Sequence, residues 1–344
     1  MTHPRPGGRF ERHPRLTGAG LVVLALLVLE LGLRSAAPGS LRFAQGMRRV
    51  HRYSRVARVD LRPSQSAALR IDREDGQPLF DFRLSTGAEV FRIEETAAPP
   101  SPGARFVHAI GDSYTMGWGV DAADSYPARL ARRLAPELAV LNLGVDGFGA
   151  IGATAKSRAL AERYPLAQAV YLFSPNDLED DRRAEAVARR SGPMHAANEA
   201  LDALRRSSYL AGVPFALRYR LQFRAGPAAT PGGTGRVPTE SLLLPEPAAL
   251  TAPPGDYPTF AALGAYRDFL AARGARLLVL VLSTQPESLA AYRFCREQGI
   301  EARLFDVPPA LRIPDEGHFN AAGNEAVAAL VAGLLGAGPD RAGR

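Results

Sequence analysis

The stretch that decides the fold is FVHAIGDSYTMGWGV, residues 106–120, in which an apolar run ends at a glycine and polar side chains follow. The run FVHAIG (106–111) is short and continuous, as is typical of a strand buried on both faces of a sheet. Asp112 and Ser113 come directly after it. A serine at a turn between a strand and a helix places its hydroxyl over the sheet edge, where backbone N–H groups of the next turn point.

Beyond this stretch, apolar runs alternate with segments of helical pattern. This alternation indicates a parallel sheet covered on both faces. The expected fold class is α/β, a three-layer α/β/α sandwich of flavodoxin type with a five-stranded parallel sheet. The further strands are expected at 139–144, 169–174, 277–283 and 302–307, and the helices at 126–135, 150–163, 259–273, 286–298 and 320–335.

A long insertion is expected at 183–258, after the third strand. Its first part, 183–224, is Arg-rich and helical in pattern, whereas 225–258 contains many Gly and Pro residues and is expected to form a long surface loop.

The composition excludes several classes of protein. The chain has 344 residues, of which 46% are apolar, with 33 Gly and 28 Pro, so it is not a disordered, collagen-like or disulfide-scaffold protein. The single cysteine, Cys295, excludes an internal disulfide and a cysteine cluster for zinc or iron–sulfur, and it is expected to be a small buried apolar side chain. We expect no cofactor and no metal ion.

The net charge of +7 lies at one end of the chain. Residues 1–60 carry eleven arginines against three acidic side chains, and the rest of the chain is close to neutral. A basic arm beside an apolar segment suits anionic lipid headgroups at least as well as nucleic acid. We therefore expect a membrane partner and no nucleic acid.

The apolar segment Leu16–Leu33 (LTGAGLVVLALLVLELGL) predicts a transmembrane anchor. Eighteen helical residues span about 27 Å, which is just enough for a bilayer core of about 30 Å. A cleaved signal peptide and a buried core helix are the alternatives. Pro38 follows the small residues 35–37 and disfavours cleavage, so we favour an uncleaved anchor. The short basic tail, residues 1–15, is expected in the cytoplasm, and the bulk of the chain outside the cytoplasmic membrane.

Residues 34–103 are expected to connect the anchor to the large domain. The basic part, 39–66, predicts a juxtamembrane linker or an interfacial helix, and 69–93 predicts two or three small antiparallel strands. A Pro-rich break at 97–103 marks the boundary. The large domain then covers 104–338, and 339–344 form a tail.

Side chains suited to chemistry follow the expected strands. Gly147 comes after the second strand, Asn176 and Asp177 after the third, and Asp315 and His318 after the fifth. Because the carboxyl ends of parallel strands share one edge of a sheet, we expect these residues to meet Ser113 there.

In this order the residues resemble the SGNH (GDSL-type) hydrolase family, and the whole chain resembles its membrane-anchored bacterial members. The resemblance covers about 104–337. It implies a serine esterase that acts on an acyl or acetyl ester of a carbohydrate, lipid or other envelope molecule. The implied roles are Ser113 as nucleophile, His318 and Asp315 as its partners, an oxyanion hole of Ser113, Gly147 and Asn176, and support from Asp112 and Asp177. Ser174 stands where the family usually has Gly, which puts the shape of that loop in doubt.

Three other interpretations remain open. The glycines of GFGAIG, residues 147–152, fit a dinucleotide-binding fingerprint, although they follow the second strand rather than the first. An O-acyltransferase on an envelope polysaccharide could use the same serine site. A catalytically silent binding module could use the insertion as its contact surface. The walls of the pocket are expected from the insertion and from loops near Trp118 and Phe148; the identity of the ester and the oligomeric state are left open.

Overall fold

A five-stranded parallel sheet forms the centre of the large domain, as predicted. The computed structural model describes residues 14–73, 76–93, 103–222, 238–247 and 255–336. The strands lie in the order β6-β5-β7-β8-β9, with every neighbouring pair parallel. Their bounds are β5 Arg105–Gly111, β6 Leu138–Asn142, β7 Leu166–Phe173, β8 Arg276–Leu282 and β9 Glu301–Phe305.

Helices cover both faces of this sheet, which makes the predicted three layers. Phe106 and Ile110 of β5 face α6, α10 and α11, whereas Val107 and Ala109 face α5 and α12. This alternation follows from the two-residue period of a strand. The helices of the domain are α4 Ser113–Met116, α5 Tyr126–Leu134, α6 Ala150–Leu160, α7 Asp177–Ala188, α10 Pro258–Ala271, α11 Pro286–Glu297 and α12 Ala321–Gly336, with one-turn helices at Ala122–Asp124 (η1) and Pro309–Leu311 (η4).

The segment before the domain folds into an N-terminal module. Helix α3 packs on a hairpin of β3 and β4, and a second hairpin joins β1 to β2. The prediction of a linker or interfacial helix over 39–66 is wrong, because Phe43 and Met47 of α3 are buried against β3 and β4. The bounds are α2 Pro14–Ser35, α3 Gly39–Val50, β1 His51–Ser54, β2 Arg58–Leu61, β3 Ser66–Asp72 and β4 Pro78–Ser85.

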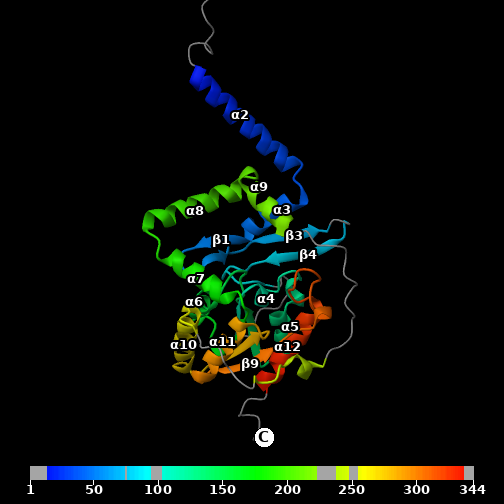
Figure 1. The fold of residues 1–344 in the computed structure, drawn as a ribbon, viewed down its shortest axis with the longest axis vertical. Helices are drawn as coiled ribbons and strands as arrows, with labels where there is room; N and C mark the ends of the chain where they lie inside the picture. The colour runs from blue at the N-terminus through cyan, green and yellow to red at the C-terminus, as the bar shows by residue number, and fades with distance from the viewer. Residues whose placement is uncertain (1–13, 74–75, 94–102, 223–237, 248–254, 337–344) are drawn as a thin grey trace, which may run out of the picture.

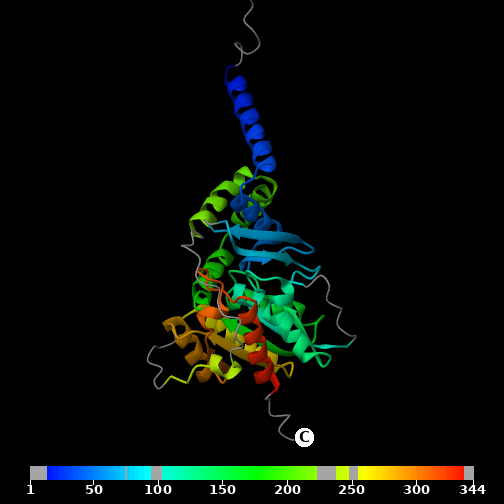
Figure 2. The ribbon, with the colours of Figure 1, turned by 90° about the vertical axis from the view of Figure 1, so that its right-hand side faces the viewer.

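The helices of the insertion pack against this module. Helices α8 (Gly192–Ser207) and α9 (Val213–Gln222), joined by the short helix η2 (Leu210–Gly212), contact α3. Figures 1 and 2 show these helices next to the base of α2, with the strands of the module beneath them and the sheet domain at the far end. The predicted loop at 225–258 lies largely outside the described residues, as do the Pro-rich break and both tails; the described part of the loop contains the short helix η3 (Thr239–Leu242).

A buried arginine joins the N-terminal module to the large domain. Arg92 is 3% exposed, and its guanidinium donates to the carbonyl oxygens of Met116, Gly117 and Val120 at 2.6–2.7 Å and of Arg83 at 3.1 Å. Its burial lowers its pKa to about 10, so the group remains charged at neutral pH. Because Met116 and Gly117 end helix α4, Arg92 supports the helix that begins at Ser113.

Replacement of Arg92 by Met should destabilise the fold by more than about 3 kcal/mol, because four carbonyl groups, three of them in buried hydrogen bonds, lose a charged donor. Chemical denaturation of the full chain in detergent measures this change. Arg70, which is exposed and pairs with Asp72 and Asp81, provides the matched control: Arg70→Met should cost less than about 1 kcal/mol. Equal losses for the two variants would show that Arg92 does not have this role.

Candidate active site

Ser113 and His318 meet at the carboxyl edge of the sheet. Asp112 accepts the N–H of Tyr114 at 2.9 Å and so begins the short helix α4, with Ser113 as its first residue. His318 lies in the loop between β9 and α12. Its Nε2 lies 2.7 Å from Ser113 Oγ, which is hydrogen-bond distance. The structure therefore brings together the serine and the histidine that the sequence singled out.

The other ring nitrogen of His318 contacts Glu316 and not Asp315. Glu316 Oε1 lies 2.6 Å from His318 Nδ1, and Glu316 Oε2 accepts the backbone N–H of His318 at 3.1 Å. Asp315 has a positive φ of 64°, and its carboxylate pairs with Arg73 at 2.7 Å. The expectation that Asp315 contacts the imidazole is thus corrected. The sequence contained the signal, an acidic residue two positions before the histidine, but spacing alone does not choose between neighbouring acids.

Aromatic rings enclose the histidine. The ring of Tyr114 lies 4.5 Å from that of His318, centroid to centroid, and Trp118 lies 6.2 Å away. Burial raises the pKa of Tyr114 to about 12, so its hydroxyl stays neutral. These rings keep one side of the imidazole apolar and restrict its rotation.

The backbone N–H groups of Ser113 and Gly147 were both expected to serve as oxyanion donors. Among the described residues, no hydrogen-bond acceptor partners the N–H of Ser113 or that of Gly147. Gly147 has a φ of +74°, and a Cβ there would come within 2.7 Å of Arg58 Nη2. The positive φ of the turn favours glycine at this position, and the Arg58 side chain lies against it.

The side chain of Asn176 is held by three polar neighbours. Its Nδ2 lies 3.1 Å from a carboxylate oxygen of Asp180 and 3.3 Å from one of Asp112, and its Oδ1 lies 2.8 Å from Ser174 Oγ. Ser174, where the resemblance leads one to expect glycine, thus contributes its hydroxyl to the loop. This hydroxyl also lies 2.7 Å from Asp112 and 2.9 Å from Asp177, so it links all three side chains.

Asp112 and Asp177 lie fully buried behind the serine. Burial raises the pKa of both carboxyl groups, that of Asp177 well above its usual value because the charge of Asp112 adds to the effect. Asp177 also accepts the hydroxyl of Tyr171 at 2.5 Å. Two buried carboxyls this close share protons rather than both ionising. Asp112 and Asp177 therefore support the loops around Ser113 and Asn176. Neither carboxyl group contacts His318.

The dinucleotide interpretation is wrong, because a carboxylate already occupies the start of the helix. Asp181 accepts the N–H of Ala150 at 2.9 Å and that of Ile151 at 3.0 Å, at the N-terminus of α6. A pyrophosphate would need these same groups. Gly149 is required here for Asp181, since a Cβ would lie 2.4 Å from the carboxyl carbon.

The N-terminal module supplies the neighbours that the sequence did not reveal. Arg58, at the turn between β1 and β2, pairs with Asp180 at 3.2 Å and lies against Gly147. Arg73 from the turn after β3 pairs with Asp315, and His51 pairs with Asp146. Nothing in the local sequence marks these residues, because the contacts join segments about 100 or more positions apart.

The expected pocket walls also need correction. Trp118 is 6% exposed and packs against Phe80 and Phe82 of the module, and Phe148 is 2% exposed in the core. Helices α8 and α9 of the insertion pack on α3. Of the expected walls, only the Trp118 ring is found beside His318, and the other neighbours described here come from the module.

The family model described as GDSL-like lipase/acylhydrolase matches residues 109–326. This match covers the sheet, Ser113 and His318 together. The chain belongs to the GDSL-like lipase/acylhydrolase family. It is accordingly an ester-hydrolysing enzyme. No curated protein matches it.

Solved structures similar to this GDSL-family enzyme have low identity and low TM-scores. A putative lipolytic protein of the G-D-S-L family from Desulfitobacterium hafniense is 12% identical, with a TM-score of 0.38, over 67% of this chain and 99% of its own. The SGNH-hydrolase esterase AlinE4 is 16% identical, with a TM-score of 0.34, over 71% and 99%. The aryl esterase of M. smegmatis is 16% identical, with a TM-score of 0.33, over 67% and 98%.

The contact of Glu316 with His318 predicts unequal effects of two neighbouring substitutions. Glu316→Gln should lower kcat for a p-nitrophenyl acetate by about 10²–10⁴, because an amide there no longer stabilises the imidazolium and can favour the wrong tautomer. Asp315→Asn, which weakens the ion pair with the largely buried Arg73 but changes no contact of the imidazole, should alter kcat by less than about threefold. A larger loss of kcat for Asp315→Asn than for Glu316→Gln would show that Asp315, and not Glu316, is the acidic partner of His318.

The Asp181 carboxyl predicts a pH-dependent stability. Burial raises its pKa from 3.8 to about 6, so the folded state holds the proton more tightly than the unfolded state. The resulting stabilisation is complete below pH 3.8 and is lost as the pH rises through 6. Between pH 4 and pH 7 the parent should lose about 2 kcal/mol relative to Asp181→Asn, as measured by denaturation at each pH. Replacement of the exposed Asp81 by Asn should leave the pH profile of the parent unchanged.

Proposed function

We propose that this enzyme is a serine esterase that works through an acyl-enzyme on Ser113. The observation that carries the proposal is the 2.7 Å contact between Ser113 Oγ and His318 Nε2. A serine hydroxyl is a weak nucleophile until a base takes its proton, and the imidazole is in position to do so. Glu316, on the opposite nitrogen, then stabilises the charged ring and holds its tautomer.

The oxyanion of the tetrahedral intermediate would be held by the N–H groups of Ser113 and Gly147, which have no protein acceptor among the described residues. Asn176 Nδ2 would be the third donor. Its two hydrogens face Asp112 and Asp180, so it would exchange the longer contact, to Asp112 at 3.3 Å, for the oxyanion. Each such donor is worth about 10²–10³ in kcat.

Collapse of this intermediate would release the alcohol, to which His318 returns the proton. Water, deprotonated by the same imidazole, would then attack the acyl carbonyl and free Ser113. We propose an acyl or acetyl ester as the substrate, carried by a carbohydrate, lipid or other molecule of the cell envelope.

The proposed location of the enzyme is based on α2. Residues Arg15–Ser35 are long and apolar enough to cross a membrane, and no part of the most apolar window is buried in the protein. A signal sequence passes the same test. We propose an uncleaved anchor in the cytoplasmic membrane, with the catalytic domain on its outer side.

Labelling with a fluorophosphonate tests this mechanism. Exposure of the full chain in detergent micelles should add one adduct to the intact mass, and Ser113→Ala should add none, because only an activated serine reacts. The exposed Ser191 is the control: Ser191→Ala should label like the parent. Absence of an adduct on the folded parent would contradict the proposal and favour a silent binding module.

A further inference from the structure

Helix α8 is amphipathic, and its polar face points toward the protein. His195 is buried, and its Nδ1 lies 2.9 Å from the hydroxyl of Tyr53 on β1. Asp202 pairs with Arg62, and Glu199 pairs with Arg55 at 2.8 Å. At 100° per residue, the polar side chains of α8 up to Arg206 fall within one third of its circumference, whereas a soluble surface helix normally turns such a face to water.

The opposite side of α8 is apolar and exposed. It consists of alanines together with Met194, Leu201 and Leu204, of which Leu204 is 56% exposed. The next helix, α9, also exposes large apolar side chains, at a spacing of four residues. The exposed large apolar side chains outside α2, within the described residues, are Val56 and six on these two helices: Met194, Leu201, Leu204, Val213, Leu217 and Leu221.

The base of α2 is fixed beside these helices. Glu30, near the end of α2, accepts the N–H groups of Tyr209 and Leu210 at 2.9 Å and the hydroxyl of Ser208 at 3.0 Å. These three residues connect α8 to α9. Arg34 also donates to the carbonyl of Ser207 at 2.5 Å. The orientation of α2 is thereby tied to the α8–α9 pair (Figures 1 and 2).

The length of the apolar part of α2 brings the protein close to a bilayer. Between Arg15 and Glu30 lie only residues 16–29, which span about 21 Å as a helix. A bilayer core measures about 30 Å. If α2 crosses a membrane, the residues that hold Glu30 must therefore lie at the membrane surface rather than away from it.

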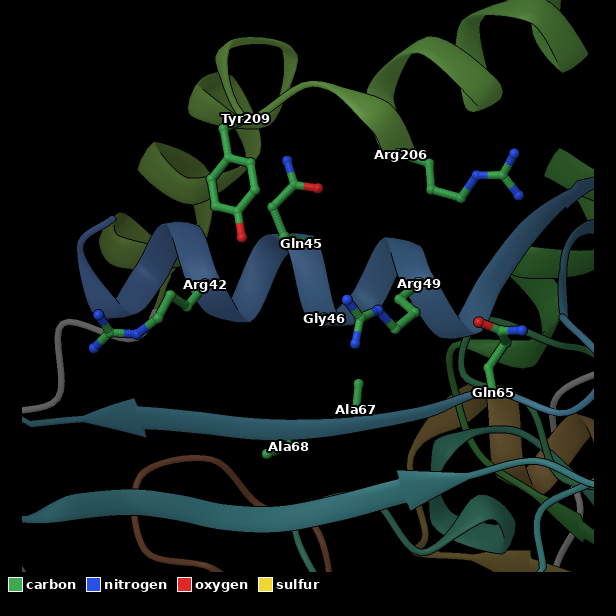
Figure 3. A pocket seen from close by; sticks show the side chains of 9 residues that line it. All are labelled: Arg42, Gln45, Gly46, Arg49, Gln65, Ala67, Ala68, Arg206 and Tyr209. Atoms are coloured by element: carbon green, nitrogen blue, oxygen red, sulfur yellow. The ribbon is translucent and has the colours of Figure 1, made fainter. Parts of the chain in front are cut away.

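Exposed arginines lie next to the leucines on α9, and further arginines line a pocket on the inner side of α8. A pocket of 420 Å³ between α3, β3 and the α8–η2 junction is lined by Arg42, Arg49 and Arg206 together with Gln45 and Tyr209 (Figure 3). No carboxylate lines it. Arg218 and Arg220 are exposed on α9. Cations placed next to exposed leucines are typical of helices that lie in the headgroup region of anionic lipids.

We propose that the outer face of α8 and α9 docks on the phospholipid bilayer that α2 crosses, with its leucines among the acyl chains and the neighbouring arginines against anionic headgroups. This inference rests on the proposed anchor and not on the proposed catalysis. It assigns the insertion a role in holding the catalytic domain at a fixed height and orientation over the membrane.

Fluorescence quenching in vesicles tests this docking. The full chain, with Leu204→Cys or Leu217→Cys labelled with an environment-sensitive fluorophore, is reconstituted into vesicles of phosphatidylcholine and phosphatidylglycerol that contain doxyl-labelled acyl chains. Cys295 is fully buried, so the parent chain should take no label. Glu297→Cys, exposed on α11 in the distal domain, is the matched control.

Labels at 204 and 217 should be quenched at least about twofold more than the label at 297, and their emission should shift to shorter wavelength. Equal quenching at all three positions would overturn the proposal. Cross-linking of Leu204→Cys between two copies without quenching would also overturn it and would assign the face to a dimer. Failure of the parent chain to float with vesicles would remove the anchor, and fluorophosphonate labelling would still report on catalysis separately.

Discussion

The contact between Ser113 and His318 joins residues 205 positions apart, and the active site depends on it. Only the parallel sheet brings them together: β5 ends just before the serine, and β9 precedes the histidine loop. Between these two strands lie β7 and β8, whose buried apolar side chains set the spacing. Any change in strand order would separate the two residues, so the apolar packing of both faces is a precondition of the chemistry.

The N-terminal module contacts both the active-site loops and the helices next to α2. Arg92 supports the end of the helix that begins at Ser113, Arg73 binds the acid next to Glu316, and Arg58 lies against Gly147. The same module carries α3, on which α8 and α9 pack, and α2 is fixed to their junction. A series of contacts therefore connects α2, α8 and α9 to the loops that position the nucleophile.

Local patterns predicted well whatever depends on neighbours in the chain. The alternation of apolar runs and helices predicted the five strands in the places where they occur, and turn residues after each strand marked Ser113 and His318. The predictions failed where a residue far along the chain determines the direction or the burial of a side chain. Asp315 turns away at a positive φ to meet Arg73, and Trp118 is covered by Phe80 and Phe82 of a module expected to be separate. In the sequence, the basic residues of α3 obscure its amphipathic pattern. For this reason a packed helix was predicted to be a linker or an interfacial helix.

By itself, the sequence determined the α/β class, the order of the strands and helices, and the residue types gathered at one sheet edge, because buried strands and helices impose periods of two and 3.6 residues. It also determined the apolar segment before them. Only the tertiary structure decided which acid holds His318, that Asp181 closes the start of α6, and that α8 turns its apolar side outward. These outcomes depend on the direction of single side chains toward partners far along the chain, and a one-dimensional pattern does not contain that direction.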